Sequence, residues 1–140
     1  MSVEENLRLI DRMVTSLNAR DWDRFSESFA KSVLVHEPGA RPTRGRDPIV
    51  ESFKVFVSCF PDARIRKVRS FGQGDWICIE VVFYGTNKGS PIWSDGLTIR
   101  PTNKTAEIEI VVVAKIQGSK ITEYHESWDR LGMLAQLGLG

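Results

Sequence analysis

The chain has 140 residues, 41% of them hydrophobic and 26% charged, with a formal net charge of only +1. This length suits one domain with a core and room for an internal cavity, so we expect a single domain over residues 1–140. The near-neutral charge gives no reason to expect a nucleic acid or a membrane as partner. The start of the chain carries early acids and no apolar signal-peptide stretch, and no run approaches a membrane span, so we expect a cytoplasmic protein.

The first part of the chain predicts helices. Apolar residues at helical spacing predict an amphipathic helix over 2–19, and a shorter helix is expected from about Asp21. After the strand candidate Val33–His36 and a loop rich in Pro, Gly and Arg, a third helix is expected to start with Asp47 as its cap. The residue before a proline avoids the α region, so Pro61 ends this helix.

The rest of the chain predicts long strands. They are expected over residues 63–71, 76–84, 105–116 and 121–129, with a long irregular link at 85–102 and a closing helix at 130–137. Helices followed by a meander of antiparallel strands predict an α+β fold with the helices on one face of the sheet. Long twisted strands curl, so the space between sheet and helices would be a cone whose mouth can take a ligand.

Several phrases in this order resemble the SnoaL-like polyketide cyclases, or ester cyclases, of the nuclear transport factor 2-like superfamily. They are VLVHEPGARPTRGRDPI at 33–49, FPD at 60–62, YGTNKG at 84–89, PTNK at 101–104 and the ending ITEYHESWDRLGMLAQLG at 121–138. The resemblance covers about residues 33–138. It implies a cone-shaped, curved antiparallel sheet covered by N-terminal helices, a cystatin-like barrel.

The resemblance also implies a chemistry and a site. Characterised members close a polyketide ester ring by an intramolecular aldol reaction that needs no metal or organic cofactor. The acid/base carboxylate of that reaction lies near the end of the last strand, and the matching position here is Asp129. The chain departs from the family at Asn87, where a histidine is usual; Asn can donate a hydrogen bond but cannot carry charge.

Asp129 has two interpretations. In an apolar pocket its pKa would be raised, because burial disfavours the charged form, and it could then act as a general acid or base. Alternatively, Asp129 caps the last helix by accepting an amide hydrogen bond from Leu131 or Gly132. Both roles could hold together.

Two histidines are further candidates for the ligand site. His125 has the same strand parity as Asp129, so the two side chains could flank one ligand. His36 belongs to a phrase that resembles the family, and we expect it at the cavity mouth. The alternative for each histidine is a structural or solvent-facing role.

Three glutamates and a tryptophan complete the candidate substrate-binding set. Glu80 interrupts an apolar strand, and it is either a pocket acid or an ion-pair partner of an arginine on the preceding strand, Arg64, Arg66 or Arg69. Glu107 and Glu109 alternate with isoleucines, so they form either a solvent face or a polar cavity wall. Trp93 lies in the long link, as a lid over the cavity or as loop packing.

The favoured function is a cofactor-free lyase or isomerase acting on a small hydrophobic carbonyl compound, with Asp129 as the catalytic acid/base. The alternatives are a non-catalytic module for small-molecule binding or dimerisation, and a hydrolase of epoxides or esters in which Asp129, Glu80 and Arg66 or Asn87 position a water. We expect no metal, because the two histidines belong to no closely spaced ligand motif. We read Cys59 and Cys78 as buried free thiols.

A homodimer through the sheet is also expected. The strand over 105–116 carries apolar residues on both parities, with Ile110 and Val112 on one and Val111 and Val113 on the other. A strand that is apolar on both faces is normally buried on both. One face packs on the helices, so the other requires a partner.

Overall fold

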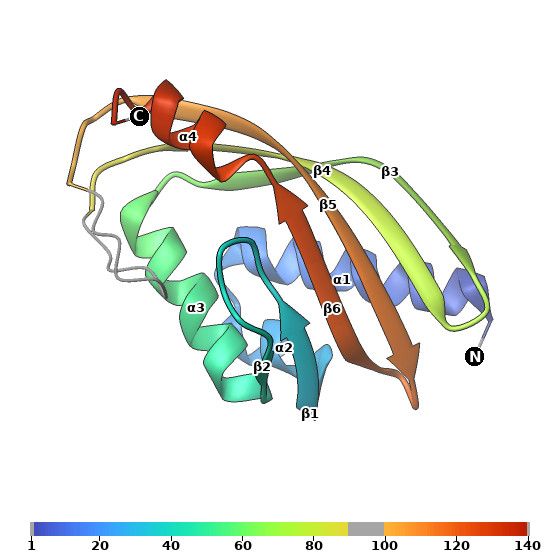
Figure 1. Cartoon of the computed structure of the whole chain (residues 1–140). Helices are drawn as coiled ribbons and strands as arrows, with labels where there is room; N and C mark the ends of the chain where they lie inside the picture. Colours follow the sequence, from blue (N-terminus) through green and yellow to red (C-terminus); the bar gives the residue numbers. More distant parts are fainter. Residues whose placement is uncertain (1, 90–99, 140) are drawn as a thin grey trace.

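A computed structural model describes residues 2–89 and 100–139 of the chain (Figure 1). The helices and strands in chain order are α1 (Val3–Ala19), α2 (Trp22–Glu27), β1 (Phe29–His36), β2 (Thr43–Arg44), α3 (Arg46–Cys59), β3 (Arg64–Gln73), β4 (Trp76–Thr86), β5 (Thr105–Gln117), β6 (Lys120–Trp128) and α4 (Arg130–Gln136). No helix in these ranges is both long enough and apolar enough to cross a bilayer.

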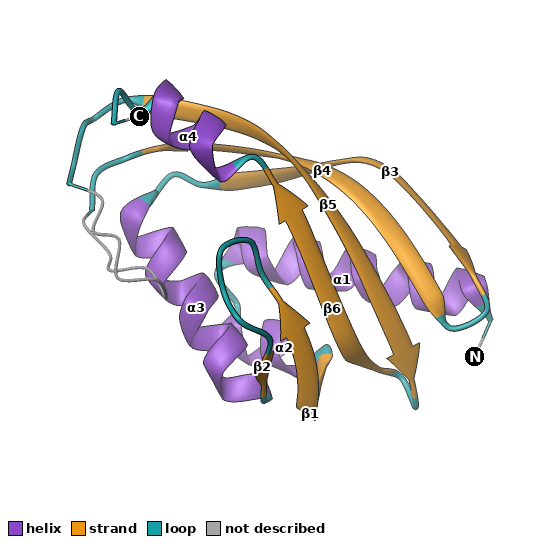
Figure 2. Ribbon diagram, in the orientation of Figure 1, coloured by secondary structure: helices purple, strands orange, loops and turns teal. Residues whose placement is uncertain are grey.

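The strands form one curved, unclosed sheet in the order β2-β1-β6-β5-β4-β3 (Figure 2). The four strands from β3 to β6 pair antiparallel in sequence order, as the meander predicts. β1 instead pairs parallel with β6, which places Val35 beside Tyr124 and His36 beside His125. The α+β fold with a curved sheet and N-terminal helices is therefore confirmed, with one parallel pair that the sequence pattern did not indicate.

Helix α1 begins and ends as its sequence indicates. The Ser2 side chain accepts a 3.1 Å hydrogen bond from the Glu5 amide, which satisfies one of the free donors of the first turn. The helix ends at Ala19, and the backbone of the following residue, Arg20, takes the left-handed conformation. Its apolar stripe, with Ile10 and Leu17, is buried in the main core.

Two element boundaries differ from the prediction. β1 begins at Phe29, four residues before the expected strand start at Val33, because α2 ends at Glu27 and the chain then pairs with β6. Helix α3 begins one residue before Asp47, and Gly45 occupies the cap position without a side-chain hydrogen bond. The φ of 123° at Gly45 is one that only glycine adopts without strain.

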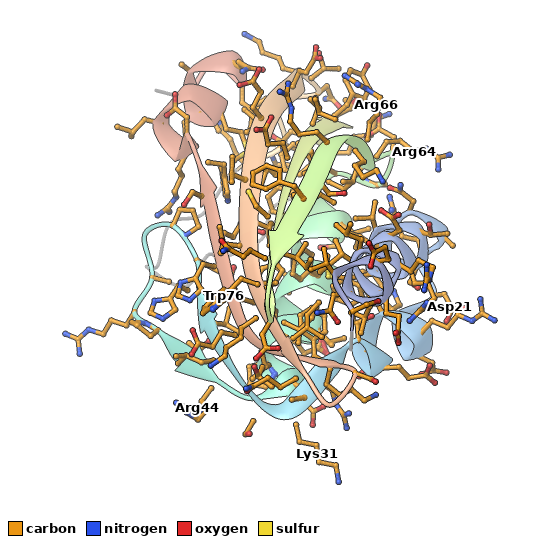
Figure 3. The ribbon with its side chains drawn as sticks, turned by 90° about the vertical axis from the view of Figure 1, so that its right-hand side faces the viewer. Asp21, Lys31, Arg44, Arg64, Arg66 and Trp76 are labelled. Atoms are coloured by element: carbon orange, nitrogen blue, oxygen red, sulfur yellow. The ribbon has the colours of Figure 1, made fainter. Side chains whose placement is uncertain are left out.

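The helices cover only one face of the sheet (Figures 1 and 2). That concave face carries the buried residues of β4 and β5, such as Ile79 and Val112, and they pack against α1 and α3. On the opposite, outer face, Trp76 of β4 lies exposed (Figure 3). The basic strand β3 lies at the sheet edge with Arg64 and Arg66 in solvent, as expected of a solvated edge strand.

Candidate functional site

A cavity of about 380 Å³ lies between the concave face of the sheet and the helices. Its volume falls in the range of small-molecule sites. Its inner wall is apolar and includes Phe25, Ile79 and Val81, which are buried. Exposed residues among its lining, such as Arg41 and Glu51, mark the mouth.

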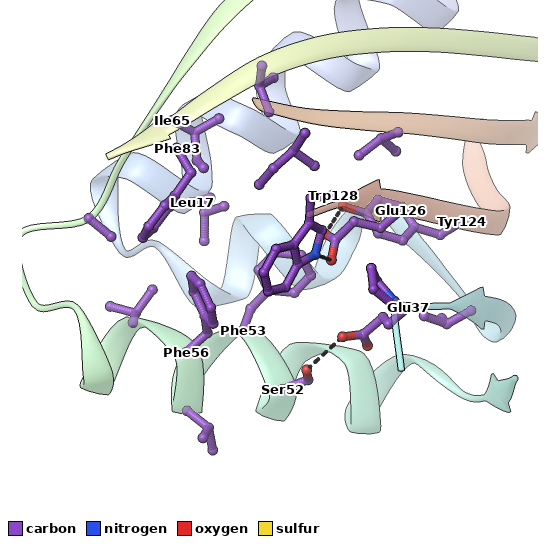
Figure 4. Close-up of a pocket in the computed structure, with 18 of the residues that line it drawn as sticks. Leu17, Glu37, Ser52, Phe53, Phe56, Ile65, Phe83, Tyr124, Glu126 and Trp128 are labelled. Carbon is purple, nitrogen blue, oxygen red and sulfur yellow. Dashed lines mark hydrogen bonds between the residues drawn. The ribbon is translucent and has the colours of Figure 1, made fainter. Parts of the chain in front are cut away.

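Glu126 of β6 places a carboxyl group in this cavity (Figure 4). The indole N–H of Trp128 donates a 2.9 Å hydrogen bond to Oε2, and the hydroxyl of Tyr124 donates a 3.3 Å bond to Oε1. All three residues alternate along β6, so they share its concave face. The pKa of Glu126 is raised to about 7, mainly by burial and also by the charge of Glu37, while the two hydrogen bonds oppose the rise.

Glu37 provides a second carboxyl group in the same cavity (Figure 4). It follows β1 directly, and its Oε2 accepts a 3.3 Å hydrogen bond from the hydroxyl of Ser52 on α3. Burial raises the pKa of Glu37, and the Ser52 bond partly opposes that effect. Apart from the exposed Glu51 at its mouth, the cavity therefore contains two carboxyl groups, Glu37 and Glu126, both held more readily in the neutral form than a carboxyl group in water.

Aromatic rings surround the two carboxyl groups. Phe53 packs edge-on against Phe25 with ring centroids 4.9 Å apart, and against Tyr124 at 6.3 Å. Phe56 packs against Trp128 at 6.3 Å. A substrate in this cavity would thus contact apolar ring surface, with its polar contacts concentrated at the glutamates and their donors.

Asp129 lies outside the cavity lining. β6 ends at Trp128, and Asp129 is the exposed N-cap of α4, where its Oδ1 accepts a 2.8 Å hydrogen bond from the Gly132 amide. The capping interpretation is therefore confirmed. The expectation that this side chain faces the cavity is wrong for the described structure. Asp129 has the parity opposite to the cavity-facing Glu126 and Trp128, and β6 ends before it. Its catalytic role stays a prediction that the geometry does not support.

His36 and His125 lie together on the outer face of the sheet. Their rings are stacked with centroids 4.3 Å apart, as their pairing across β1 and β6 dictates. Nε2 of His125 also lies 3.2 Å from the Glu123 carboxylate, and the Trp76 ring is 6.2 Å away. Neither histidine lines the cavity, because both have the opposite parity to Tyr124 and Glu126.

The three glutamates of the candidate set lie on the outer face as well. Glu80 forms a 3.1 Å ion pair with Arg69 on β3, which confirms the ion-pair interpretation. Glu107 and Glu109 are exposed on β5, on the solvent face. None of the three lines the cavity.

Asn87 has a structural role in the described residues. It is fully buried; its Nδ2 donates to the Cys59 sulfur at 2.9 Å and to the Gly89 carbonyl at 3.0 Å, and its Oδ1 accepts from Thr102. These bonds join the end of β4 to α3 and to the segment before β5, and Asn87 does not line the cavity. Trp93 lies outside the described residues.

Of the two cavity glutamates that the sequence-based prediction missed, Glu126 was indicated by the sequence pattern and Glu37 was not. Tyr124 and Trp128 stand two positions before and after Glu126, and large aromatic residues mark the buried face of a strand. No comparable signal marked Glu37, which lies in a loop phrase. In residues 2–89 and 100–139, no three His, Cys, Asp or Glu side chains are grouped closely enough to hold a metal ion.

The fold and the acid-bearing cavity define a protein of the ketosteroid isomerase-like, nuclear transport factor 2-like fold. The family model described as SnoaL-like polyketide cyclase matches residues 7–137. The chain therefore belongs to the SnoaL-like polyketide cyclase family. A search among curated proteins found no match.

Solved structures of low sequence identity share this fold. TsrD from Streptomyces laurentii is 16% identical with a TM-score of 0.86, over 100% of this chain and 99% of that one. IdmH from Streptomyces antibioticus, described as a candidate polyketide cyclase, is 23% identical with a TM-score of 0.78, over 94% and 96%. An LEH-like epoxide hydrolase from M. tuberculosis is 14% identical with a TM-score of 0.74, over 99% and 92%.

Proposed function

We propose that this protein is a cofactor-free lyase or isomerase that moves a proton on a small hydrophobic carbonyl compound, with Glu126 as its acid/base. The observation that carries the proposal is a carboxyl group in an apolar cavity whose pKa is raised to about 7. A general acid or base is most effective when its pKa lies near the working pH. Membership of a cyclase family agrees with this chemistry.

Glu126 is equipped for the abstraction of a proton next to a carbonyl group. As carboxylate, it removes the proton and leaves an enolate in the cavity. Trp128 and Tyr124 hold its two oxygens in place, so the base is oriented before substrate binds. The aromatic wall favours a hydrophobic substrate, and the cavity volume of about 380 Å³ limits its size.

The test is proton exchange on a probe compound. Ethyl benzoylacetate, a small aryl β-keto ester, is followed by NMR in D₂O, and the protein should accelerate exchange of its acidic proton above the uncatalysed rate. Glu126→Gln should lower the acceleration by about 10²–10⁴-fold, the range for loss of a general acid/base. Glu123→Gln on the outer face of the same strand is the matched control and should exchange normally. Binding of the probe without accelerated exchange would support a binding module instead.

A water-activating hydrolase is the second candidate, and the second carboxyl group in the cavity favours it. One carboxyl group, as carboxylate, can deprotonate a water, while the other, as carboxylic acid, donates its proton to the oxygen of the opening epoxide. One solved structure with this fold is an epoxide hydrolase. Incubation with styrene oxide in ¹⁸O-labelled water distinguishes the two: labelled diol that depends on Glu126 would favour the hydrolase.

We also propose a homodimer formed through the outer face of the sheet. The exposed apolar residues there are Phe71, Trp76, Tyr84, Val111 and Val113. The stacked His36 and His125 rings continue the patch toward β1. Phe71, Cys78 and Val113 form one cross-strand row on this face. Exposed apolar side chains gathered on a sheet face are typical of a protein interface. A partner of the same chain would bury it.

A further inference from the structure

The strand register places Glu37 and Glu126 side by side. β1 and β6 run parallel, with Val35 opposite Tyr124 and His36 opposite His125. Glu37 is the next residue after His36, and Glu126 the next after His125. Neighbouring strands lie about 4.8 Å apart, and β1 ends at His36, so each glutamate directly follows one member of the last paired position. Both side chains enter the same cavity (Figure 4).

The two carboxyl groups have different partners. Glu126 accepts hydrogen bonds on both oxygens, from Trp128 and Tyr124. Glu37 is held by the hydroxyl of Ser52. The charge of Glu37 also acts on Tyr124, whose pKa is raised well above its ordinary value, mainly by burial. Two negative charges at adjacent positions in an apolar cavity repel each other, so one proton between the two groups lowers the energy.

The other charged groups of the cavity lie on different elements. Arg20 at the end of α1 donates to the carbonyl oxygens of Leu17, Pro61 and Ala63. Arg41 and Glu51 are exposed at the mouth. Arg130 lines the cavity from α4, and its guanidinium lies against Gly39 in the loop after β1. Burial and the neighbouring charge of Glu37 are the effects that raise the pKa of Glu126.

We propose that Glu37 and Glu126 form a carboxyl couple that shares one proton and that both groups take part in catalysis. One group, as carboxylate, removes the proton from the carbon next to the substrate carbonyl. The other, as carboxylic acid, donates its proton to the carbonyl oxygen as the C–H electron pair becomes the enol double bond. The couple keeps one proton throughout, so no cofactor is consumed. The substrate class is therefore a carbonyl compound whose oxygen and acidic carbon reach both groups, as in a β-keto ester. The catalytic part rests on the proposed function.

The sharing of a proton can be tested without a substrate. With ¹³C-labelled glutamate, the carboxyl resonances of Glu37 and Glu126 should titrate in two coupled steps. Glu37→Gln keeps the size of the side chain and removes its charge, so the pKa of Glu126 should move down toward the usual glutamate value. Glu123→Gln removes a charge from the other face of β6 and should leave the Glu126 titration unchanged.

A second variant leaves both carboxyl groups in place. Ser52→Ala removes the donor that favours ionised Glu37, so more of the shared proton should reside on Glu37 and the pKa of Glu126 should fall. An unchanged Glu126 titration in both Glu37→Gln and Ser52→Ala would overturn the couple.

The exchange assay separates this proposal from the proposed function. If both hold, Glu37→Gln should lose acceleration of ethyl benzoylacetate exchange by about 10²-fold or more, as expected for an acid/base group. Normal exchange in Glu37→Gln with loss in Glu126→Gln would overturn the catalytic role of Glu37 and leave Glu126 as the acid/base. If the wild-type protein does not accelerate exchange, the catalytic role of the couple is overturned. The carboxyl titration would then still decide whether Glu37 and Glu126 share a proton.

Discussion

The indole N–H of Trp128 donates a 2.9 Å hydrogen bond to Oε2 of Glu126, two residues earlier on the same strand face. Trp128 thus supports the ionised form of a carboxyl group that burial favours as neutral. Its ring also packs against Phe56 of α3. Trp128 therefore forms part of the apolar wall of the cavity and also favours the ionised form of Glu126.

Replacing Trp128 with Phe should raise the pKa of Glu126 above its value of about 7. The phenyl ring retains much of the packing but has no N–H to donate to the carboxylate. Tyr124→Phe should act in the same direction and more weakly, because the lost hydrogen bond is longer, 3.3 Å. Carboxyl titration by NMR measures both, with Trp22→Phe on α2 as the control. A Glu126 pKa that fell in Trp128→Phe would contradict this account.

Stability should depend on pH through Glu126. The pKa of Glu126 is about 7 when folded against an ordinary value of 4.5, so the folded state binds the proton more tightly. The stabilising contribution is fully present below pH 4.5, declines between 4.5 and 7, and is lost above the folded pKa. The total loss should be about 3 kcal/mol.

Glu126→Gln removes this dependence. The free energy of unfolding of the variant, relative to wild type, should therefore be higher at pH 8 than at pH 5. Urea denaturation at both pH values measures it, with Glu123→Gln as the control for loss of a glutamate from β6. The same difference between variant and wild type at both pH values would show that Glu126 has an ordinary pKa.

The fold class could be predicted from the sequence, because each helix and long strand is indicated by a pattern within its own segment. The Ser2 cap and the apolar repeat of α1 are contained in one segment, as are Pro61 after α3 and the alternation of β4. The parallel pairing of β1 with β6 could not be predicted from the sequence, because it joins segments some 90 residues apart and no local pattern indicates such a pair.

The candidate site was harder to predict, because alternation along a strand does not say which set of side chains faces the cavity. His125 and Asp129 have the same parity, but that parity faces outward on β6. The strand also ends at Trp128, and the Asp129 side chain turns back to cap the helix. Glu126 was missed although aromatic residues flank it on the same parity. Glu37 becomes visible only when the register of β1 and β6 is known.

The outer sheet face should hold two copies of the chain together. Trp76 lies near His125 there, and Val113 pairs with His125 across β5 and β6. Trp76→Glu should place a charge in the proposed interface, which is costly when buried without a partner, and should shift the protein to monomer. Sedimentation at micromolar concentration measures this. Leu131→Glu, a change at a residue 77% exposed on α4, should leave the dimer intact. A wild-type protein that sediments as a monomer would end the proposal.

Asp129 should matter for stability and not for proton transfer. Its Oδ1 caps α4 through the Gly132 amide, and the loss of such a cap costs about 1 kcal/mol. Asp129→Ala should therefore lower the free energy of unfolding by about that amount. Asp129→Asn should change it little, because Asn caps a helix about as well as Asp. Urea denaturation measures both variants.

Asp129→Asn and Glu126→Gln decide between Asp129 and Glu126 as the acid/base. Because Asp129 lies outside the cavity lining, the Asp129→Asn variant should be as active as the wild-type protein in ethyl benzoylacetate exchange. The carboxyl titration of Glu126 should also be unchanged in this variant. Glu126→Gln should lose the exchange while α4 stays capped. The reverse result, with exchange lost in Asp129→Asn at unchanged stability and kept in Glu126→Gln, would restore Asp129 as the catalytic carboxylate. It would also require the Asp129 side chain to leave its cap position, since its Oδ1 is bonded to the Gly132 amide outside the cavity lining.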